Sequence, residues 1–406
     1  MRAVWFHFKA AFLNALTVFL NLFLRRDRKI WVFGSWMGSK FADNSRFLFQ
    51  YLSENREKYG IDRVIWVARN RALVKKLRAM NYEAVLAGSF AGFFNTVRAG
   101  VHVVCNMPYS NGPYRGDING NLSYGAVKIQ LWHGFPIKAN VQSKAQPSGI
   151  RASRLYRFSL PGQWAEKQYF VSTGRECSRR YRLWFANEDM RIIEAGYPRN
   201  CACPRLMESE QSVVSDVTRK PLTILYLPTF RSSEVTFPHP LEDPAFRQWL
   251  ESEDALWIEK PHSAAAMESF FSSSDQFMKD RVMRLKEDFD INVLLPHVSL
   301  VVTDYSSVSV DAIYFDRPVV YYVPDIESYT RSDRGMIDGF ESITSGPIVL
   351  RPEGMLSAVK QVLSKTDREQ KDGFTEIKKT YFDGRKFSFE QEMNDILNAI
   401  NKERQA

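Results

Sequence analysis

The chain has 406 residues, which is too long for one ordinary hydrophobic core, so we expect two domains of about 150–200 residues. Hydrophobic residues make up 45% and charged residues 25%, a composition typical of a globular protein and not of a disordered or fibrous one. The formal net charge of +9 suits an anionic partner, such as a membrane surface, a phosphorylated substrate or nucleic acid. None of the four cysteines forms a CxxC pair, so the spacing predicts no zinc site and favours reduced thiols in a cytosolic compartment.

Residues 1–28 are predicted to form an amphipathic helix. Apolar residues recur at spacings of three and four along one face, namely Trp5, Phe8, Phe12, Leu16, Phe19 and Phe23. Polar residues occupy another face, namely His7, Asn14, Thr17 and Asn21. A membrane-spanning helix has no need of a polar stripe, whereas an interfacial helix does, so the pattern favours a peripheral, monotopic helix on the cytoplasmic leaflet. The alternative is a helix that packs on the protein itself.

A basic cluster follows this helix and consists of Arg25, Arg26, Arg28 and Lys29. We expect each of these side chains to add about 1 kcal/mol of attraction to anionic head groups. No small-residue cleavage site precedes the cluster, so the segment does not match a secretory signal peptide. An anionic membrane surface is therefore an expected partner.

Residues 29–205 are predicted to form an N-terminal Rossmann-like domain. Strand-like runs at 29–36, 63–69, 84–88, 101–106 and 126–132 alternate with helix-like runs at 44–60, 71–80 and 90–100. This alternation is typical of a doubly wound parallel sheet. Asp43 or Asn44 is the expected cap of the first of these helices. Residues 108–125 are rich in Gly, Asn, Pro and Tyr and are predicted to form a long loop.

A second alternation predicts another Rossmann-like domain at residues 221–385, after a polar linker at 206–220. Residues 386–406 are predicted to form a closing C-terminal helix. Two doubly wound α/β domains facing a central cleft suggest a GT-B-like architecture. Because ligands of open α/β sheets bind beyond the carboxyl ends of the strands, the polar clusters that follow the apolar runs are the candidate sites.

The stretch QLWHGFPIK places His133 directly after an apolar strand-like run. A neutral imidazole with a pKa near ambient pH can take a proton from an attacking hydroxyl, and Lys138 would add positive charge nearby. The competing interpretation is a structural histidine with satisfied hydrogen bonds. The isolated motif does not exclude it.

Two polar clusters end strands in the second half of the chain. Lys260 and His262 combine a point charge with a hydrogen-bond donor, which suits a phosphate, although an ordinary polar strand end looks the same. The motif TDYSS offers hydroxyl and backbone donors at a strand-to-helix junction, and its candidate residues are Thr303, Asp304, Ser306 and Ser307. Plain N-capping by the two serines is the alternative, and it is compatible with anion binding.

Two arginines also lie at predicted strand ends. Arg199 belongs to GYPRN, and Arg231 belongs to PTFR, in which Thr229 comes two residues earlier. A guanidinium offers a fork of donors that can clamp a phosphate, so both are candidate binding residues. Two ordinary surface arginines are the alternative.

Several common motifs are absent from the sequence. There is no Walker GxxxxGK[ST], no GxGxxG and no HExxH, and nothing resembles a nucleic-acid-binding motif. Asp288-Phe-Asp290 looks like a DxD metal site, but a carboxylate pair beside a helix end is the commoner interpretation. We therefore expect no cofactor, no metal ion and no nucleic-acid partner.

The order of the motifs resembles that of the CDP-glycerol glycerophosphotransferase family, the enzymes of teichoic acid assembly and related capsule polymers. The matching motifs are, in order, WHG-x-P-x-K, GYPRN, PTFR, KPH, TDYSS and RGMIDGFESITSGPIV. DNSRFLF near Asp43 also fits an early motif of the family. The resemblance covers roughly residues 30–385, nearly the whole chain.

The resemblance implies a GT-B fold and the transfer of a polyol phosphate, with glycerol phosphate as the first choice. The donor would be CDP-activated, CMP would be released, and the acceptor would be a hydroxyl of a lipid-linked saccharide or of a polyol-phosphate polymer. Residues 29–205 would bind the acceptor and 221–385 the CDP donor. Membrane association would be monotopic.

The resemblance also implies roles for individual residues. His133 matches the general base, and His262 matches a second essential histidine at the donor pyrophosphate. The donor-binding positions match Arg231, Asp304, Ser306 and Ser307. Such a cluster, together with Lys260, would hold the charge that develops during phosphoryl transfer without a metal ion.

Two departures leave the polyol and the acceptor open. Cys201 stands where the family pattern usually continues GYPRN with Asp, and the loop at 108–125 looks long. Two rival functions also remain. One is a GT-B glycosyltransferase that uses a nucleotide-sugar. The other is a membrane-surface scaffold that binds an anionic polymer through charge and needs neither His133 nor His262.

Overall fold

The computed structural model describes residues 2–106, 116–138, 168–185, 188–229, 237–260, 275–327, 329 and 336–402. The chain divides into two compact units. The first unit comprises Met1–His133, Ala145–Arg205 and Lys386–Ala406, and the second comprises Gly134–Lys144 and Leu206–Arg385. The motif around His133 is therefore divided, because the histidine belongs to the first unit and the residues after it belong to the second.

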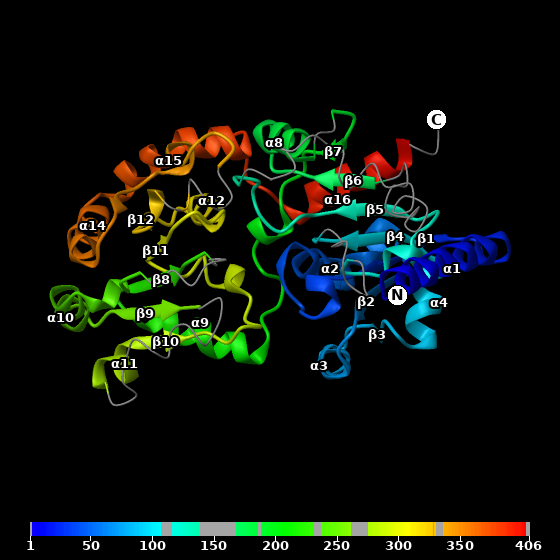
Figure 1. Cartoon of the computed structure of the whole chain (residues 1–406), viewed down its shortest axis with the longest axis horizontal. Helices are drawn as coiled ribbons and strands as arrows, with labels where there is room; N and C mark the ends of the chain where they lie inside the picture. The colour runs from blue at the N-terminus through cyan, green and yellow to red at the C-terminus, as the bar shows by residue number, and fades with distance from the viewer. Residues whose placement is uncertain are drawn as a thin grey trace. The chain divides into compact units, whose positions relative to one another are not determined.

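Within the described residues, the first unit contains a seven-stranded parallel sheet (Figure 1). In sheet order the strands are β3 (Ala84–Leu86), β2 (Arg63–Ala68), β1 (Asp27–Phe33), β4 (Ala99–Val104), β5 (Val127–Gln130), β6 (Gln168–Val171) and β7 (Arg191–Ile193). Its helices are α1 (Arg2–Phe23), α2 (Asp43–Asn55), α3 (Arg71–Ala79), α4 (Phe90–Arg98), α8 (Arg175–Phe185) and α16 (Phe389–Lys402). The central strands β2 and β4 are buried along nearly their whole length, and β1 is buried over residues 30–33, as expected of a sheet covered on both faces.

The second unit contains a six-stranded parallel sheet within its described residues (Figure 1). The strands are, in sheet order, β10 (Val282–Arg284), β9 (Leu256–Glu259), β8 (Thr223–Leu227), β11 (Leu300–Thr303), β12 (Val319–Tyr322) and β13 (Ile348–Val349). The helices are α9 (Glu208–Arg219), α10 (Pro244–Ser252), α11 (Gln276–Arg281), α12 (Val308–Tyr314), α14 (Met355–Leu363) and α15 (Asp367–Phe382). The predicted α/β class with two doubly wound parallel sheets is confirmed.

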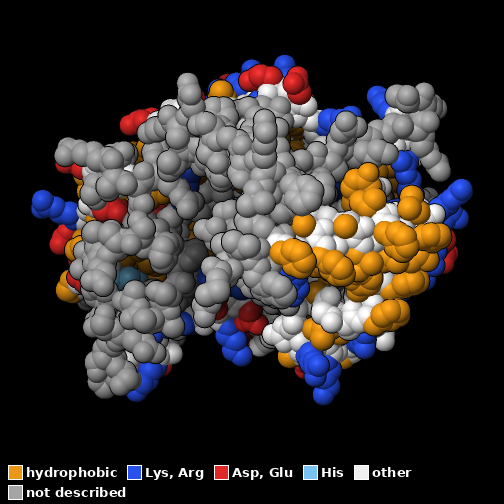
Figure 2. All heavy atoms as spheres, turned by 45° about the vertical axis from the view of Figure 1, so that its right-hand side comes forward, with side chains coloured by type: hydrophobic (Ala, Val, Ile, Leu, Met, Phe, Trp, Pro, Cys, Tyr) orange, Lys and Arg blue, Asp and Glu red, His pale blue; other side chains and the backbone are white. Residues whose placement is uncertain are grey.

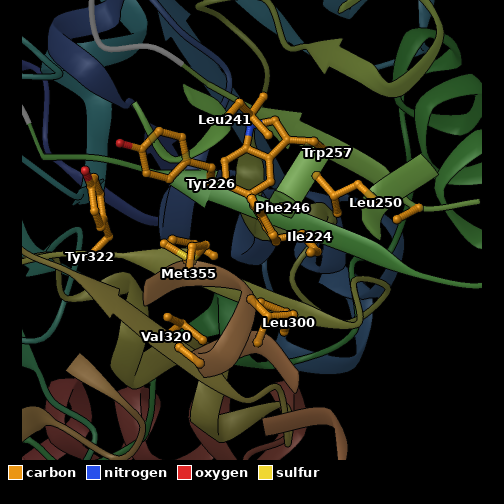
Figure 3. Packing of buried hydrophobic residues seen from close by; sticks show 14 of the residues in the cluster. Ile224, Tyr226, Leu241, Phe246, Leu250, Trp257, Leu300, Val320, Tyr322 and Met355 are labelled. Carbon is orange, nitrogen blue, oxygen red and sulfur yellow. The ribbon is translucent and has the colours of Figure 1, made fainter. Parts of the chain in front are cut away.

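A hydrophobic core holds α10, α11 and α14 against one face of the sheet of the second unit (Figure 3). Trp257 of β9 packs edge to face against Phe246 of α10, with ring centroids 5.8 Å apart. Val320 of β12 and Met355 of α14 belong to the same buried cluster. The strand ends of this sheet are thereby held in a rigid frame.

The structure differs from the sequence analysis in two boundaries. Residues 206–220, expected to be a linker, contain α9, which forms because the buried carboxylate of Glu210 accepts the N–H of Met207 at 2.8 Å and so satisfies the start of the helix. The N-terminal helix ends at Phe23, before the expected residue 28, and β1 begins at Asp27.

The C-terminal helix α16 packs on the first unit although it follows the second unit in the sequence. The Phe389 ring stacks on Tyr51 with centroids 4.6 Å apart, and the Tyr169 hydroxyl donates to the Ala399 carbonyl at 3.1 Å. All four cysteines are free thiols, as predicted. No helix among the described residues combines the length and apolar character needed to cross a membrane.

Candidate active site

His133 lies just beyond the carboxyl end of β5, where the chain turns sharply. Trp132 has a φ of 59°, a left-handed conformation that is costly for a bulky residue. The side-chain amide of Asn44 donates to the carbonyls of Leu131 and Trp132 at 3.2 and 2.9 Å and holds this turn. Asp43 also has a positive φ, of 64°. Strained backbone conformations that surrounding hydrogen bonds hold in place are typical of functional sites.

The imidazole of His133 is half-buried and contacts the loop after β4. Its Nδ1 lies 3.0 Å from the Cys105 carbonyl oxygen and 3.3 Å from the Asn106 side-chain nitrogen. Burial lowers the pKa of His133 below its ordinary value, and Arg199 acts in the same direction, while Asp43 and the Cys105 carbonyl oppose the shift. The ring is therefore neutral at pH 7, the state that a general base requires.

Arg199 lies in the short turn η5 (Pro198–Asn200) and is buried beside His133. Its Nη1 binds the Asp43 carboxylate at 3.0 Å and donates to the His133 carbonyl at 2.9 Å. Its backbone N–H donates to the Asn44 side-chain oxygen at 3.1 Å. The alternative of an ordinary surface arginine is therefore wrong. A phosphate-clamping role for Arg199 stays a prediction.

Gly196 of the same GYPRN motif permits a tight approach of the chain. Its φ is 97°, and a Cβ atom at this position would lie 2.3 Å from the Phe387 ring. Only glycine adopts this conformation without clash. The Gly196 backbone, three residues before Arg199, thus lies against Phe387, in the segment that leads into α16.

Asp43 and Asn44 are site residues that the sequence analysis treated as capping candidates and as part of the early family motif DNSRFLF, without a role in the site. The N-cap residue of α2 is Ala42, which makes no side-chain capping bond. The Asp43 carboxylate accepts the Asn44 N–H at 2.8 Å and also binds Arg199, and the Asn44 side chain holds the turn before His133. The first turn of α2 is polar yet buried, which is unusual for the start of a helix. The match of DNSRFLF to an early family motif was the one signal in the sequence that pointed to these residues.

In the second unit, the ends of β8 and β11 are joined by side chains of the PTFR and TDYSS motifs. The Asp304 carboxylate accepts the Thr229 N–H at 2.9 Å and its hydroxyl at 2.5 Å. The Thr303 hydroxyl donates to the Leu227 carbonyl at 2.7 Å. The structure therefore brings Thr229, Thr303 and Asp304 together, and the carboxylate acts as an acceptor that holds the neighbouring strand end.

The two serines of TDYSS differ in their local contacts. The Ser306 hydroxyl accepts the Val308 N–H at 3.4 Å, whereas Ser307 is the N-cap residue of α12 and its side chain makes no capping bond. Both are half-buried. N-capping therefore explains the Ser306 hydroxyl only through one long hydrogen bond, and it does not explain the position of the Ser307 hydroxyl.

Lys260 follows β9, and its ammonium donates to the Phe289 carbonyl at 2.6 Å. Asp290, in the DxD-like sequence, caps the turn η8 (Ile291–Val293) through a 3.1 Å bond from the Asn292 N–H, which favours the structural interpretation of that pair. Among the residues that the structure describes, no group of three His, Cys, Asp or Glu side chains is arranged to hold a metal ion. His262 and Arg231 lie outside the described residues.

Lys138 belongs to the second unit. It forms an isolated β-bridge with Met336, and its Nζ lies 5.9 Å from the centre of the Tyr329 ring. The Tyr329 ring stacks on Tyr305 of the TDYSS motif with centroids 3.8 Å apart. That Lys138 adds charge near His133 stays a prediction.

Helix α1 packs on the first unit through its polar face. Asn14 and Thr17 are buried, the Thr17 hydroxyl donates to the Asn121 carbonyl at 3.2 Å, and the Asn21 amide donates to the Tyr124 carbonyl at 2.9 Å. Arg26 ends this contact with bonds to the carbonyls of Thr96, Ala99, Leu122 and Tyr124. The expectation that Arg26 holds a head group is wrong, because its guanidinium is used inside the protein.

The opposite face of α1 is apolar and exposed. Phe12, Phe19 and Phe23 have exposed fractions of 59%, 57% and 72%. Hydrophobic side chains gather on this side of the first unit in Figure 2. Helix α4 contacts α1 and adds Phe90, which is 82% exposed and stacks on Phe94. This surface, formed by the outer residues of α1 and by Phe90, is called the α1 surface below.

Comparisons with known proteins agree with the predicted family. A family model described as CDP-Glycerol:Poly(glycerophosphate) glycerophosphotransferase matches residues 16–388. The chain is 27% identical to the teichoic acid poly(glycerol phosphate) polymerase of Bacillus spizizenii over 350 residues, which is 83% of this chain and 84% of that protein. It is 26% identical to the protein of the same name from Bacillus subtilis over 352 residues, but it spans only 44% of that longer relative.

Among solved structures, the wall teichoic acid polymerase TagF superimposes on the chain with a TM-score of 0.71 and 19% identity, covering 100% of this chain and 98% of that one. At this identity the likeness concerns the fold. It confirms the predicted GT-B-like class.

Proposed function

The chain belongs to the CDP-glycerol:poly(glycerophosphate) glycerophosphotransferase family, and we propose that it transfers glycerol phosphate from CDP-glycerol to a hydroxyl group of a teichoic-acid-type acceptor and releases CMP. The choice of glycerol rests on the names of the relatives, which are poly(glycerol phosphate) polymerases. The acceptor is a lipid-linked saccharide or a growing polyol-phosphate chain.

The observation that carries the proposal is the state of His133. Its pKa is lowered by burial, and its Nδ1 lies 3.0 Å from a fixed carbonyl oxygen, that of Cys105. A proton on Nδ1 satisfies that carbonyl and leaves the Nε2 lone pair to accept another proton. A histidine held in this way is suited to deprotonate an incoming hydroxyl.

In the proposed reaction, the acceptor hydroxyl gives its proton to Nε2 of His133 as its oxygen bonds to the β-phosphorus of CDP-glycerol. The bond between that phosphorus and the bridging oxygen breaks, and CMP leaves with the bond's electron pair. Catalysis of phosphoryl transfer consists mostly of positioning and charge stabilisation. We assign the charge stabilisation to Lys260, Arg231 and His262, of which the last two lie outside the described residues.

The TDYSS and PTFR residues support the donor in two different ways. The half-buried hydroxyls of Ser306 and Ser307 bind phosphate oxygens directly. Thr229, Thr303 and Asp304 hold the ends of β8 and β11 together, so they shape the donor site through the backbone. No metal ion is required in this proposal, because cationic side chains take its place.

The proposal is tested with purified protein, CDP-glycerol, CDP-ribitol and a set of UDP-sugars, each offered with a synthetic lipid-linked acceptor. We expect CMP release and a new phosphodiester signal in ³¹P NMR with CDP-glycerol, both unchanged by EDTA. Turnover of a UDP-sugar without CMP release would instead establish the glycosyltransferase alternative. Preferred turnover of CDP-ribitol would correct the polyol and leave the reaction class intact.

We further propose that the α1 surface inserts into the head-group region of the cytoplasmic leaflet. The polar face of α1 is bound to the protein and its phenylalanines point away from it, which supports peripheral attachment. Arg25 and Lys29 are exposed near the end of the helix and supply the attraction to anionic lipid. The two interpretations of this helix from the sequence, packing on the protein and lying on a membrane, are then compatible.

Vesicle flotation tests the membrane proposal. Replacing Phe12, Phe19 and Phe23 with serine removes about 1.5–3 kcal/mol of apolar burial for each side chain that inserts, so binding to anionic vesicles is expected to be lost. Leu350→Ser is the matched control, because Leu350 is 54% exposed on the second unit. Equal flotation of the triple variant and the control would remove the α1 surface as the attachment site.

A further inference from the structure

A buried carboxylate, Asp117, joins two loops beside His133. One of its oxygens accepts the Cys105 N–H at 2.8 Å and the Asn106 N–H at 2.7 Å, and the other accepts the Met37 N–H at 2.7 Å. Cys105 and Asn106 follow β4, and Met37 lies in the turn η1 (Trp36–Gly38) that follows β1. Asp117 is only 2% exposed. The predicted loop at 108–125 therefore contains the residue that fastens two strand ends.

The carboxylate is balanced by N–H dipoles. Burial raises the pKa of Asp117 to about 6, and the N–H bonds from Met37, Asn106 and Cys105 act in the opposite direction. At neutral pH the group is therefore ionised and accepts all three bonds. Burying a carboxylate is costly unless such bonds are kept, so the geometry of the two loops depends on Asp117.

The two residues that Asp117 holds after β4 compete for the same nitrogen of His133. The Cys105 carbonyl oxygen requires a proton on Nδ1, at 3.0 Å. The Asn106 side-chain nitrogen, at 3.3 Å, requires an Nδ1 lone pair. The Asn106 amide cannot turn away freely, because its oxygen accepts the Trp36 N–H at 3.0 Å. Which tautomer of His133 is more stable depends on how close the Cys105 carbonyl is held to Nδ1.

We propose that Asp117 is a positioning residue for His133: by holding the Cys105 and Asn106 amides, it keeps the Cys105 carbonyl close to Nδ1 and so keeps the imidazole in the tautomer whose Nε2 is free to accept a proton. The consequence for turnover rests on the proposed function of His133 as the base. The tautomer itself does not depend on that function. The hydrogen bonds of Asp117 go to backbone N–H groups and not to the His133 ring, so its effect is exerted through the backbone of the loop after β4.

The variant Asp117→Asn tests this inference. An amide offers one oxygen and places an NH₂ group against a backbone N–H, so at least one of the three bonds is lost and the loop after β4 shifts. A misplacement of about 1 Å at a catalytic group can cost on the order of 100-fold in rate. We therefore expect kcat to fall about 10- to 100-fold, while the KM for CDP-glycerol stays within about twofold. Asp62→Asn, an exposed carboxylate in the same unit, is the matched control.

A spectroscopic measurement separates positioning from general loss of structure. In protein labelled with ¹⁵N-histidine, we expect the wild-type His133 ring to carry its proton on Nδ1, and we expect Asp117→Asn to move it partly to Nε2. His133→Ala assigns the signal. Should Asp117→Asn be too unstable, Asp117→Glu replaces it, since it keeps the charge and displaces the carboxylate by one methylene.

Each outcome of these measurements has a defined meaning. A wild-type ring protonated on Nε2 would overturn the inference without any variant. A folded Asp117 variant with unchanged ring signals and unchanged kcat would overturn it as well. If the tautomer shifts as expected but His133→Ala retains full turnover, the positioning role stands and the proposed base is wrong.

Discussion

In both units side chains hold the backbone, and the units differ in what that backbone positions. In the first unit, the Asn44 side chain fixes the turn that carries His133, and the Cys105 carbonyl contacts the His133 ring. In the second unit, charged side chains hold the backbone: Asp304 accepts the Thr229 N–H, and Lys260 donates to the Phe289 carbonyl. The residues of the family motifs therefore fall into two groups. Some are placed to contact a substrate, and others shape the site by holding the backbone.

This difference indicates what each unit must control. A general base needs a defined tautomer and a neutral ring at the working pH. The fixed Cys105 carbonyl favours the first, and burial, which lowers the pKa of His133, favours the second. A site for a pyrophosphate needs strand ends in register, so that hydroxyl and backbone donors converge. Variants of His133 and of the residues that hold it should therefore change the rate, and variants that loosen the ends of β8 and β11 should change donor affinity.

The largest expected effect is on His133. His133→Ala removes the proposed base, and turnover is expected to fall by about 10²–10⁴-fold, the usual contribution of general base catalysis. Binding of CDP-glycerol, measured by calorimetry, should remain. His297→Ala, an exposed histidine of the second unit, is the control. Retained turnover in His133→Ala would remove the assignment of the base.

The next effect concerns the buried ion pair behind His133. Arg199→Met leaves the Asp43 carboxylate buried without its cation, and such a loss typically costs about 3–5 kcal/mol of unfolding free energy. Urea denaturation measures it. The control is Arg219→Met, whose ion pair with Asp216 is exposed and should contribute no more than about 1 kcal/mol. Equal stability of the two variants would show that the Asp43–Arg199 pair contributes no more than a surface pair.

A smaller effect is expected at the junction of β8 and β11. Thr229→Val removes the hydroxyl that donates to the Asp304 carboxylate, a bond to a charged group worth about 1.5–3 kcal/mol. We expect the Kd for CDP-glycerol to rise about tenfold and the ring signals of His133 to stay unchanged. Thr229→Ser should restore most of the affinity, and exposed Thr218→Val should have no effect. A change in kcat alone would contradict the division between the two units.

The smallest effect is a displacement of the pH profile. Because burial lowers the pKa of His133, the ring stays neutral down to a pH below the ordinary histidine value of about 6.5. Activity should therefore be constant around neutrality and fall as the pH drops through this lowered pKa. Thr229→Val should leave that acid limb in place. A wild-type limb above about pH 6.5 would contradict the lowered pKa.

Local patterns in the sequence were enough to predict the strand ends and their motifs. Apolar runs followed by polar clusters predicted the parallel sheets, and they placed His133, Lys260 and Asp304 at carboxyl ends of strands, where the structure has them. Arg199 was singled out for phosphate, which stays a prediction, and the structure shows its guanidinium paired with Asp43. That pairing joins residues 156 positions apart, which no local pattern reveals.

The sequence by itself determined which residues were apolar, which were polar and how often each recurred, and this was sufficient for the α/β class and for the amphipathic pattern of α1. The family came from the resemblance of its ordered motifs. Only the tertiary structure decided which face of α1 turns inward, because the carbonyls that receive Thr17, Asn21 and Arg26 come from residues about 70 to 100 positions away. It also decided that Asp117, in a stretch expected to be a plain loop, fastens the loops beside His133. Long-range hydrogen bonds to backbone groups leave no periodic trace in a sequence, since every residue carries the same amide and carbonyl.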